Sequence, residues 1–133
     1  MRNLMIVLMS AALLASPVSA KQPLREISSI DDALLDLGVA DLIRKNCPSI
    51  SARKIKAFNY MMALKAQANG LGYSDTEIRA YIKNEDEKDR MRARGAAFFR
   101  SRGVDTSNPQ SYCALGRAEI QKSSRIGSLL RAK

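Results

Sequence analysis

Apolar side chains recur every three or four residues through most of the chain, which is the spacing of amphipathic helices. In the first long stretch the stripe is Ile30, Ala33, Leu34, Leu37 and Ala40, widened by Leu35, Val39, Leu42 and Ile43. Ser29 is a suitable N-cap, and Arg44 and Lys45 occupy the last turn, as the helix dipole favours. We therefore expect a well-buried first helix, in which Gly38 marks the close crossing of another helix.

Pro48 ends this helix, because it disfavours helical geometry at Cys47. Ser49 or Ser51 then caps a second helix that runs to about Leu71. Its apolar side comprises Ile55, Phe58, Met61, Met62, Leu64 and Ala68. Such a row of methionine and aromatic side chains is compatible with a binding surface, but we favour core packing, since a small domain needs this helix at its centre.

The remaining helices are marked by their caps. Ser74 and Glu77 form a capping box for a short third helix, with Ile78, Tyr81 and Ile82 pointing inward. Asn84 or the following acidic run opens a fourth helix, and Gly103 ends it in the left-handed conformation. The fifth helix begins at Asn108 with Pro109, and a short last helix spans 125–131. Because no convincing two-residue alternation occurs, we predict an all-α, single-domain bundle of five to six helices with one disulfide.

Residues 1–20 have the composition of a signal peptide. Arg2 forms a short basic region, an apolar run extends from Leu4 to Leu14, and Val18-Ser19-Ala20 provides small side chains for cleavage. A membrane anchor is the alternative, but the uncharged stretch is short for a span and no stop-transfer pattern follows. We expect cleavage after Ala20, a periplasmic helical domain of residues 21–133, and no membrane span in it.

The two cysteines, Cys47 and Cys113, lie 66 positions apart. In an oxidising compartment we expect them to form a disulfide. A redox-active thiol pair is the alternative, but it would normally have the close Cys-x-x-Cys spacing. The chain-entropy relation gives a loop of this length about 4 kcal/mol of stabilisation.

Positive charge is unevenly distributed along the chain. The formal charge is +9, and loss of Arg2 with the signal peptide leaves +8. No acidic residue lies between Asp41 and Asp75. The same interval contains the candidate basic surface, which consists of Arg44, Lys45, Arg53, Lys54 and Lys56. Such a surface favours encounters with anionic partners and weakens as salt increases, although plain solvation explains it equally well.

No residue pattern reaches the standard of a catalytic, metal or cofactor site. The absence of histidine excludes His-dependent triads, and two cysteines cannot complete a tetrahedral zinc site. The adjacent acidic residues at 31–32 and 85–86 fall at expected helix N-termini, where dipole effects account for them. Ser51 and Lys54 have Ser-x-x-Lys spacing, but we interpret them as a cap and a surface residue. We therefore predict a protein that is not an enzyme and has no cofactor.

Several short motifs together resemble a known family. They are the run from Ile43 to Arg53, Gly72-Tyr73-Ser74-Asp75 with Glu77-Ile78, Arg92-Ala93-Arg94-Gly95, Cys113 with Gly116-Arg117-Ala118-Glu119-Ile120, and Ile126-Gly127 with Leu129-Leu130. This combination resembles an uncharacterised family of small exported alphaproteobacterial proteins, over nearly all of residues 21–133. The resemblance implies one domain, export and paired cysteines. It implies no activity, so no functional residues can be transferred.

Three kinds of function remain compatible with the sequence. We favour a non-catalytic binding protein whose basic surface meets an acidic protein or another anionic component of the cell envelope. Nucleic acid fits the charge but not the expected compartment. A periplasmic chaperone or an enzyme inhibitor is the alternative, and an enzyme is less favoured. The sequence leaves the oligomeric state undefined.

Overall fold

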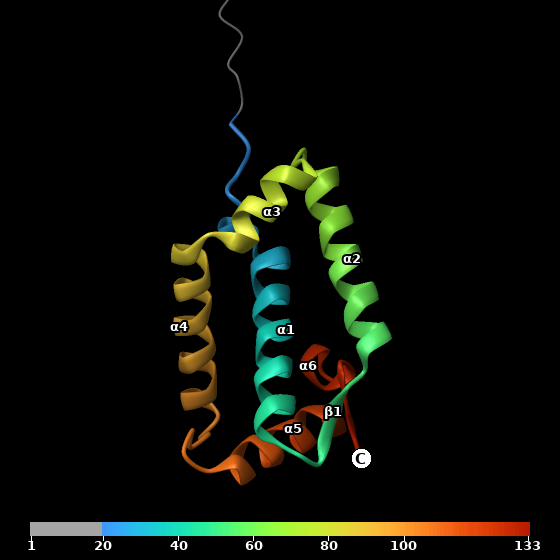
Figure 1. Cartoon of the computed structure of the whole chain (residues 1–133), viewed down its shortest axis with the longest axis vertical. Coiled ribbons are helices and arrows are strands. Elements are labelled where there is room, and N and C mark those ends of the chain that lie inside the picture. Colours follow the sequence, from blue (N-terminus) through green and yellow to red (C-terminus); the bar gives the residue numbers. More distant parts are fainter. Residues whose placement is uncertain (1–19) are drawn as a thin grey trace, which may run out of the picture.

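The computed structural model describes residues 20–133 (Figure 1). The expected signal peptide therefore lies outside the described residues, apart from Ala20. The described part contains a 3-10 turn, six α-helices and two short strands. In order these are η1 (Leu24–Glu26), α1 (Ser28–Asn46), β1 (Ile50–Ala52), α2 (Lys54–Gly70), α3 (Asp75–Lys83), α4 (Glu85–Ser101), α5 (Pro109–Lys122), α6 (Arg125–Ser128) and β2 (Leu130–Ala132). The predicted helical class and helix number are confirmed.

Helix α1 is the central element. It lies between α2 and α4 in Figure 1 and also contacts η1, β1, α5 and α6. The larger core cluster forms around its second half, where Ile43 is fully buried. Other members are Val39, Ala40, Cys47, Ile50, Phe99, Tyr112, Cys113, Leu115, Ile126, Leu129 and Leu130. Thus α1 is largely buried, as its apolar stripe predicts, although Leu42 from that stripe is 41% exposed.

A smaller cluster lies at the other end of α1. Leu24 and Ile30 pack there with Ala68 from α2 and Ile78 from α3. Ala68 is the buried residue of α2, so this end of the helix is the one that is firmly packed. The rest of α2 extends from this cluster to β1 at the opposite end of the molecule (Figure 1).

The two-stranded sheet was not predicted. Strands β1 and β2 pair antiparallel, with Ser51 opposite Arg131. The expected last helix is therefore wrong beyond Ser128, because the chain becomes extended and its backbone pairs with β1. Buried side chains of Ile50 and Leu130 fasten the sheet to the core. Strands of three residues are too short for alternation to reveal them.

Most predicted helix caps are confirmed, and two are wrong. Ser74 and Glu77 form the capping box, Asn84 caps α4, and Asn108 precedes Pro109 at the start of α5. In contrast, α1 begins at Ser28 without a side-chain cap. Helix α2 begins at Lys54, also without one, because Ser49 and Ser51 lie before and within β1.

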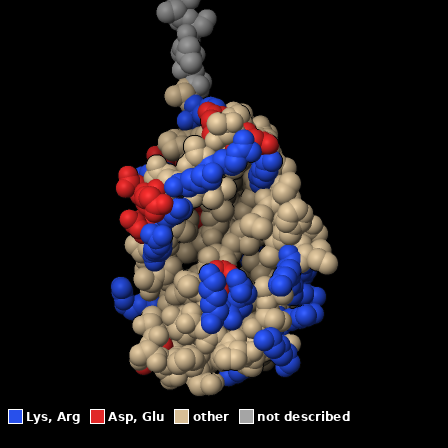
Figure 2. Space-filling view, in the orientation of Figure 1, with Lys and Arg blue, Asp and Glu red and all other residues tan. Residues whose placement is uncertain are grey.

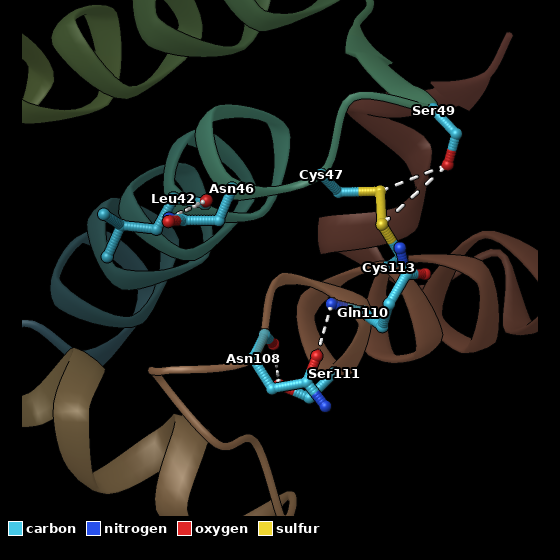
Figure 3. Close-up of a disulfide and its surroundings, with 8 residues drawn as sticks. All are labelled: Leu42, Asn46, Cys47, Ser49, Asn108, Gln110, Ser111 and Cys113. Atoms are coloured by element: carbon cyan, nitrogen blue, oxygen red, sulfur yellow. Dashed lines mark hydrogen bonds between the residues drawn. A yellow bond between two sulfur atoms is a disulfide. The ribbon is translucent and has the colours of Figure 1, made fainter.

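The predicted disulfide is present. Cys47, at the end of α1, is bonded to Cys113 on α5, and both are buried (Figure 3). The Ser49 hydroxyl lies 3.2 Å from Cys47 Sγ and 3.8 Å from Cys113 Sγ. Since a disulfide sulfur carries no proton, Ser49 is the donor. The bond holds the turn after α1 against α5 and so fixes where β1 begins.

Close backbone approach occurs at Gly116 and Gly127, not at Gly38. A Cβ atom added to Gly38 would meet no atom within 4 Å, so the predicted helix crossing there is wrong. A Cβ atom on Gly127 would lie 1.9 Å from the Glu119 carbonyl oxygen, and one on Gly116 would lie 2.4 Å from Ile50 Cδ1. These two glycines allow α5 to pack closely against α6 and β1.

None of the helices in residues 20–133 combines the length and apolar character that crossing a lipid bilayer requires.

Candidate functional site

The apolar stripe of α2 is largely exposed, which contradicts its predicted place in the core. Ile55 is 80% exposed and Phe58 is 58% exposed, and Met61 and Met62 are about half exposed. Ala68, from the predicted stripe, is buried as expected, but elsewhere α2 faces the core with Ala57 and Tyr60. The sequence pattern identified the apolar stripe correctly. It did not indicate that the stripe would lie uncovered by the other elements of residues 20–133.

Three of these exposed side chains, Ile55, Phe58 and Met61, line a large open groove, whereas Met62 lies outside it. One wall is a single face of α1 with Leu37 and Ala40, and the other is the first half of α2 with Ile55, Phe58 and Met61. The sheet and adjoining residues form the floor, contributing Ile50, Ala52, Leu129 and Leu130. The groove has a volume of about 1310 Å³. Figure 2 shows the hollow between the α1 and α2 sides of the molecule.

Basic side chains surround this apolar surface. They are Arg44, Arg53, Lys54, Lys56, Arg131 and Lys133. Asp41 is the acidic residue that lines the same groove within residues 20–133. In Figure 2, Lys and Arg side chains lie above, below and to the right of the hollow, and acidic side chains gather on the α4 side and at the top of the molecule. The site is therefore apolar inside and strongly positive at its edge.

Four of the five predicted basic residues lie together at this groove, namely Arg44, Arg53, Lys54 and Lys56. Lys45 is not in the lining and forms an ion pair with Asp41 at 2.6 Å. Sequence reasoning missed Arg131 and Lys133. Pairing of β1 with β2 places Arg131 opposite Ser51, whose hydroxyl accepts a hydrogen bond from Arg131 Nε at 3.2 Å. No local pattern indicated this pairing.

Most of the basic residues in the groove have no acidic partner. Within residues 20–133, which contain every acidic residue of the sequence, Arg44 pairs with Asp41 at 2.5 Å. No ion pair in this part of the chain involves Arg53, Lys54 or Lys56. Lys54 and Lys56 also occupy the first turn of α2, where the helix dipole is positive and basic residues are unfavourable. The local fold therefore does not compensate their charge.

Asp41 is the counter-charge inside the groove. Burial alone would raise the pKa of its carboxyl group, but hydrogen bonds and ion pairs from Lys45 and Arg44 outweigh this effect. The pKa of Asp41 is consequently lowered, so the carboxylate is negative at neutral pH. It competes with any anionic ligand for Arg44.

A second charged cluster holds α1 to α4 on the other side of α1. Asp31 is buried and accepts a hydrogen bond from Arg90 Nη1 at 3.1 Å, and a further one from Arg94. Arg94 also pairs with Asp32 at 2.8 Å, and Asp31 raises the pKa of Arg90 above its ordinary value. The adjacent carboxylates 31–32 thus make interhelical ion pairs, in addition to any dipole effect.

A third cluster surrounds Glu119 at the junction of α5 and α6. Ser124 donates to its carboxylate at 2.5 Å and Lys122 at 3.1 Å. Burial raises the pKa of Glu119, but these contacts together with the charge of Arg102 lower it below its usual value. Nearby, burial raises the pKa of Asp36 despite its ion pair with Arg125. These contacts fasten α6 to α5 and α1.

The structure also shows the surroundings of the Ser-x-x-Lys pair and of the candidate metal-ligating side chains. Within residues 20–133, no group of three or more His, Cys, Asp or Glu side chains is arranged to hold a metal ion. Ser51 and Lys54 both line the groove, with Ser51 engaged by Arg131. The groove's own chemistry is therefore apolar contact combined with cationic attraction.

Fold and groove together define a small helical, disulfide-linked domain with an open, basic-edged apolar surface. A family profile described as a family of unknown function, DUF5333, matches residues 22–131. The chain belongs to this family. No curated protein and no solved structure matches it significantly.

Proposed function

We propose that the protein is a non-catalytic binding protein, and that the groove between α1, α2 and the sheet receives an acidic partner from the cell envelope. The observation that carries this proposal is the combination of an uncovered apolar surface with six basic residues and one acidic residue around it. Plain solvation accounts for scattered charge, but it does not account for apolar side chains left exposed at the centre of that charge.

The size of the groove supports a macromolecular partner. Pockets for small molecules typically enclose about 300–1,000 Å³ and bury most of the ligand. This groove has about 1310 Å³ and is open along one side. A partner that covers Phe58 and Met61 would remove apolar surface from water, and its anionic groups would replace the missing counter-charges of Arg53 and Lys54.

We propose further that the protein acts in the periplasm after cleavage near Ala20. The signal-peptide pattern of residues 1–20 supports export, and the disulfide is compatible with an oxidising compartment. Intact mass of the protein from a periplasmic extract tests this. The expected species begins at Lys21, and a species that retains residues 1–20 would contradict it.

The test of the binding function compares two variants of equal charge. One reverses Arg53, Lys54 and Lys56 to glutamate, and the control reverses Arg79, Lys83 and Arg100, which are exposed residues of α3 and α4. Tagged protein of each kind is mixed with envelope extract at low and high salt. An acidic partner should be retained by wild type and control at low salt and lost from the groove variant.

Equal loss from both variants would mean that net charge alone acts, and would contradict a specific site. Retention by the groove variant, or binding that does not change with salt, would also contradict the proposal, since exposed charge interactions are screened over about 8–10 Å at physiological salt.

A chaperone is the second candidate, and the exposed row Ile55, Phe58 and Met61 favours it. Flexible, polarisable methionine side chains adapt to varied apolar surfaces. Suppression of client aggregation at acid pH by the wild type, together with its loss in Phe58→Ser, would support this candidate over a dedicated acidic partner.

A further inference from the structure

We infer that the segment bound in the groove is an amphipathic α-helix of an acidic protein, with its apolar side against α2 and the sheet and its carboxylates against the basic edge. This inference rests on the proposed binding function and identifies the partner's structure and chemistry. It is carried by the shape of the groove, the kind of side chains that line it and their charge.

The dimensions of the groove suit a helix. The lining part of α2 from Lys54 to Met61 covers about two turns, or about 12 Å at 1.5 Å per residue. A bound helix of two to three turns, about 11–16 Å long at 5.4 Å per turn, matches this length of α2. Helices that bind in grooves use apolar anchor residues spaced three or four positions apart, so that the anchors lie along one side of the helix.

Addition of a strand is a poorer match. The sheet has three residues in each strand, so an added strand could gain few main-chain hydrogen bonds from β1 or β2. The accessible lining consists instead of side chains, with Phe58 and Met61 on one wall and Leu37 on the other. An incoming helix contacts such a surface through its own side chains.

A lipid surface is also less suitable. The apolar side chains of Leu37, Ala40 and Leu130 lie inside the hollow between α1 and α2, where a flat bilayer cannot reach them. Ile55 is the most exposed of the large apolar residues that line the groove. A membrane would therefore cover the outer edge of α2 and leave the α1 wall of the groove, including Leu37, without a partner.

A second copy of the chain lacks suitable acidic surface. Helix α2 has no acidic residue, so two α2 helices packed together would bring Lys54 and Lys56 near other lysines. The acidic start of α4 is partly neutralised within its own helix, where Lys88 pairs with Glu85 at 2.7 Å and Arg92 pairs with Asp89. An acidic helix from another protein provides the complementary charge without this competition.

The probe is a fluorescent peptide of about 18 residues, long enough to form a helix in isolation, with leucines on one side and glutamates on the other. A second peptide has the same sequence except that prolines replace two central residues, which prevents the helix. Polyglutamate and vesicles of anionic phospholipid complete the set. Binding of each to the full chain is measured by anisotropy or co-sedimentation at low and high salt.

We expect the helical peptide to bind at least about tenfold more tightly than the proline peptide, because only the helix aligns its apolar anchors. Phe58→Ser with Met61→Ser should weaken it by about tenfold or more, as for central anchors of an interface. Ile82 on α3 is 56% exposed, so its predicted inward position is wrong, and Ile82→Ser should leave binding unchanged. Asp41→Asn should tighten binding a few-fold by releasing Arg44.

The outcomes distinguish failure of the helical partner from failure of the proposed binding function. If polyglutamate or vesicles bind through Arg53, Lys54 and Lys56 while both peptides bind equally, the acidic site stands and the helix is wrong. If sedimentation shows that the chain self-associates through Phe58, a second copy is the occupant and the inference is overturned. If no anionic probe binds at low salt, both proposals fail.

Discussion

At the scale of single residues, Asp31 contributes a specific kind of interaction between α1 and α4. Its carboxylate is buried, whereas Arg90 and Arg94 remain 27% and 32% exposed at their side chains. Removing one partner from a buried ion pair leaves the other charge uncompensated, which costs about 3–5 kcal/mol when both are fully buried. Because water reaches both arginines here, the cost should lie below this range.

We predict that Asp31→Asn lowers the free energy of unfolding by about 2–3 kcal/mol. Asp32→Asn is the matched control. Asp32 also pairs with Arg94, but its side chain is 48% exposed, so its loss should cost less than about 1 kcal/mol. Urea unfolding of both variants measures the difference. Equal effects would show that the burial of Asp31 is unimportant.

Substitution by alanine should change the stability of the protein in opposite directions at two glycines. Gly127→Ala places a methyl group against the Glu119 carbonyl, which must shift, and overpacking of this kind costs about 1–3 kcal/mol or more. Gly38→Ala meets nothing within 4 Å on α1 and should stabilise the protein by about 0.5–1 kcal/mol. Thermal unfolding gives both values, and destabilisation by Gly38→Ala would contradict the open space there.

At the level of secondary-structure elements, α2 shows that periodicity predicts the presence of a helix but not whether its apolar side is buried. The apolar spacing and the position of Pro48 predict the helix, and local caps predict α3, α4 and α5, because these signals depend on nearby residues alone. Burial of Phe58 depends on whether another element reaches it, and the chain in residues 20–133 provides none. The groove could not be predicted for a similar reason: Arg131 joins it only through long-range pairing of β2 with β1.

The stability of the fold should depend little on the exposed row of α2. We predict that Phe58→Ser lowers the free energy of unfolding by less than about 1 kcal/mol, since most of its ring is already in water. Ile43→Ala, at a fully buried position on α1, should cost about 2–5 kcal/mol. Chemical denaturation measures both values. A large loss of stability in Phe58→Ser would show that this side chain is part of the core, and would contradict its exposure.

At the scale of the whole molecule, stability should fall in acid. The carboxyl groups of Asp41 and Glu119 have pKa values below their ordinary ones, because their contacts with Lys, Arg and Ser outweigh burial. Such groups contribute stability that is present above the unfolded pKa and is lost as the pH falls through the folded pKa. The raised pKa of Asp36 has the opposite sign and offsets part of this loss.

We therefore predict that the free energy of unfolding decreases below about pH 4.5, the ordinary pKa of a glutamate carboxyl group. Glu119→Gln should flatten this dependence, since glutamine does not titrate. Urea unfolding across pH 3–7 tests it. A wild-type protein that becomes more stable over the same fall in pH would contradict the sign assigned to Glu119 and Asp41.

Methionine methyl groups can report directly whether a ligand enters the groove between α1 and α2. Met61 lines the groove, whereas Met91 lies on α4. With these methyl groups labelled, NMR spectra are recorded as the acidic helical peptide is added at low salt. We expect the Met61 signal to shift and the Met91 signal to stay in place, and we expect high salt to reverse the change. A shift at Met91 with none at Met61 would contradict it.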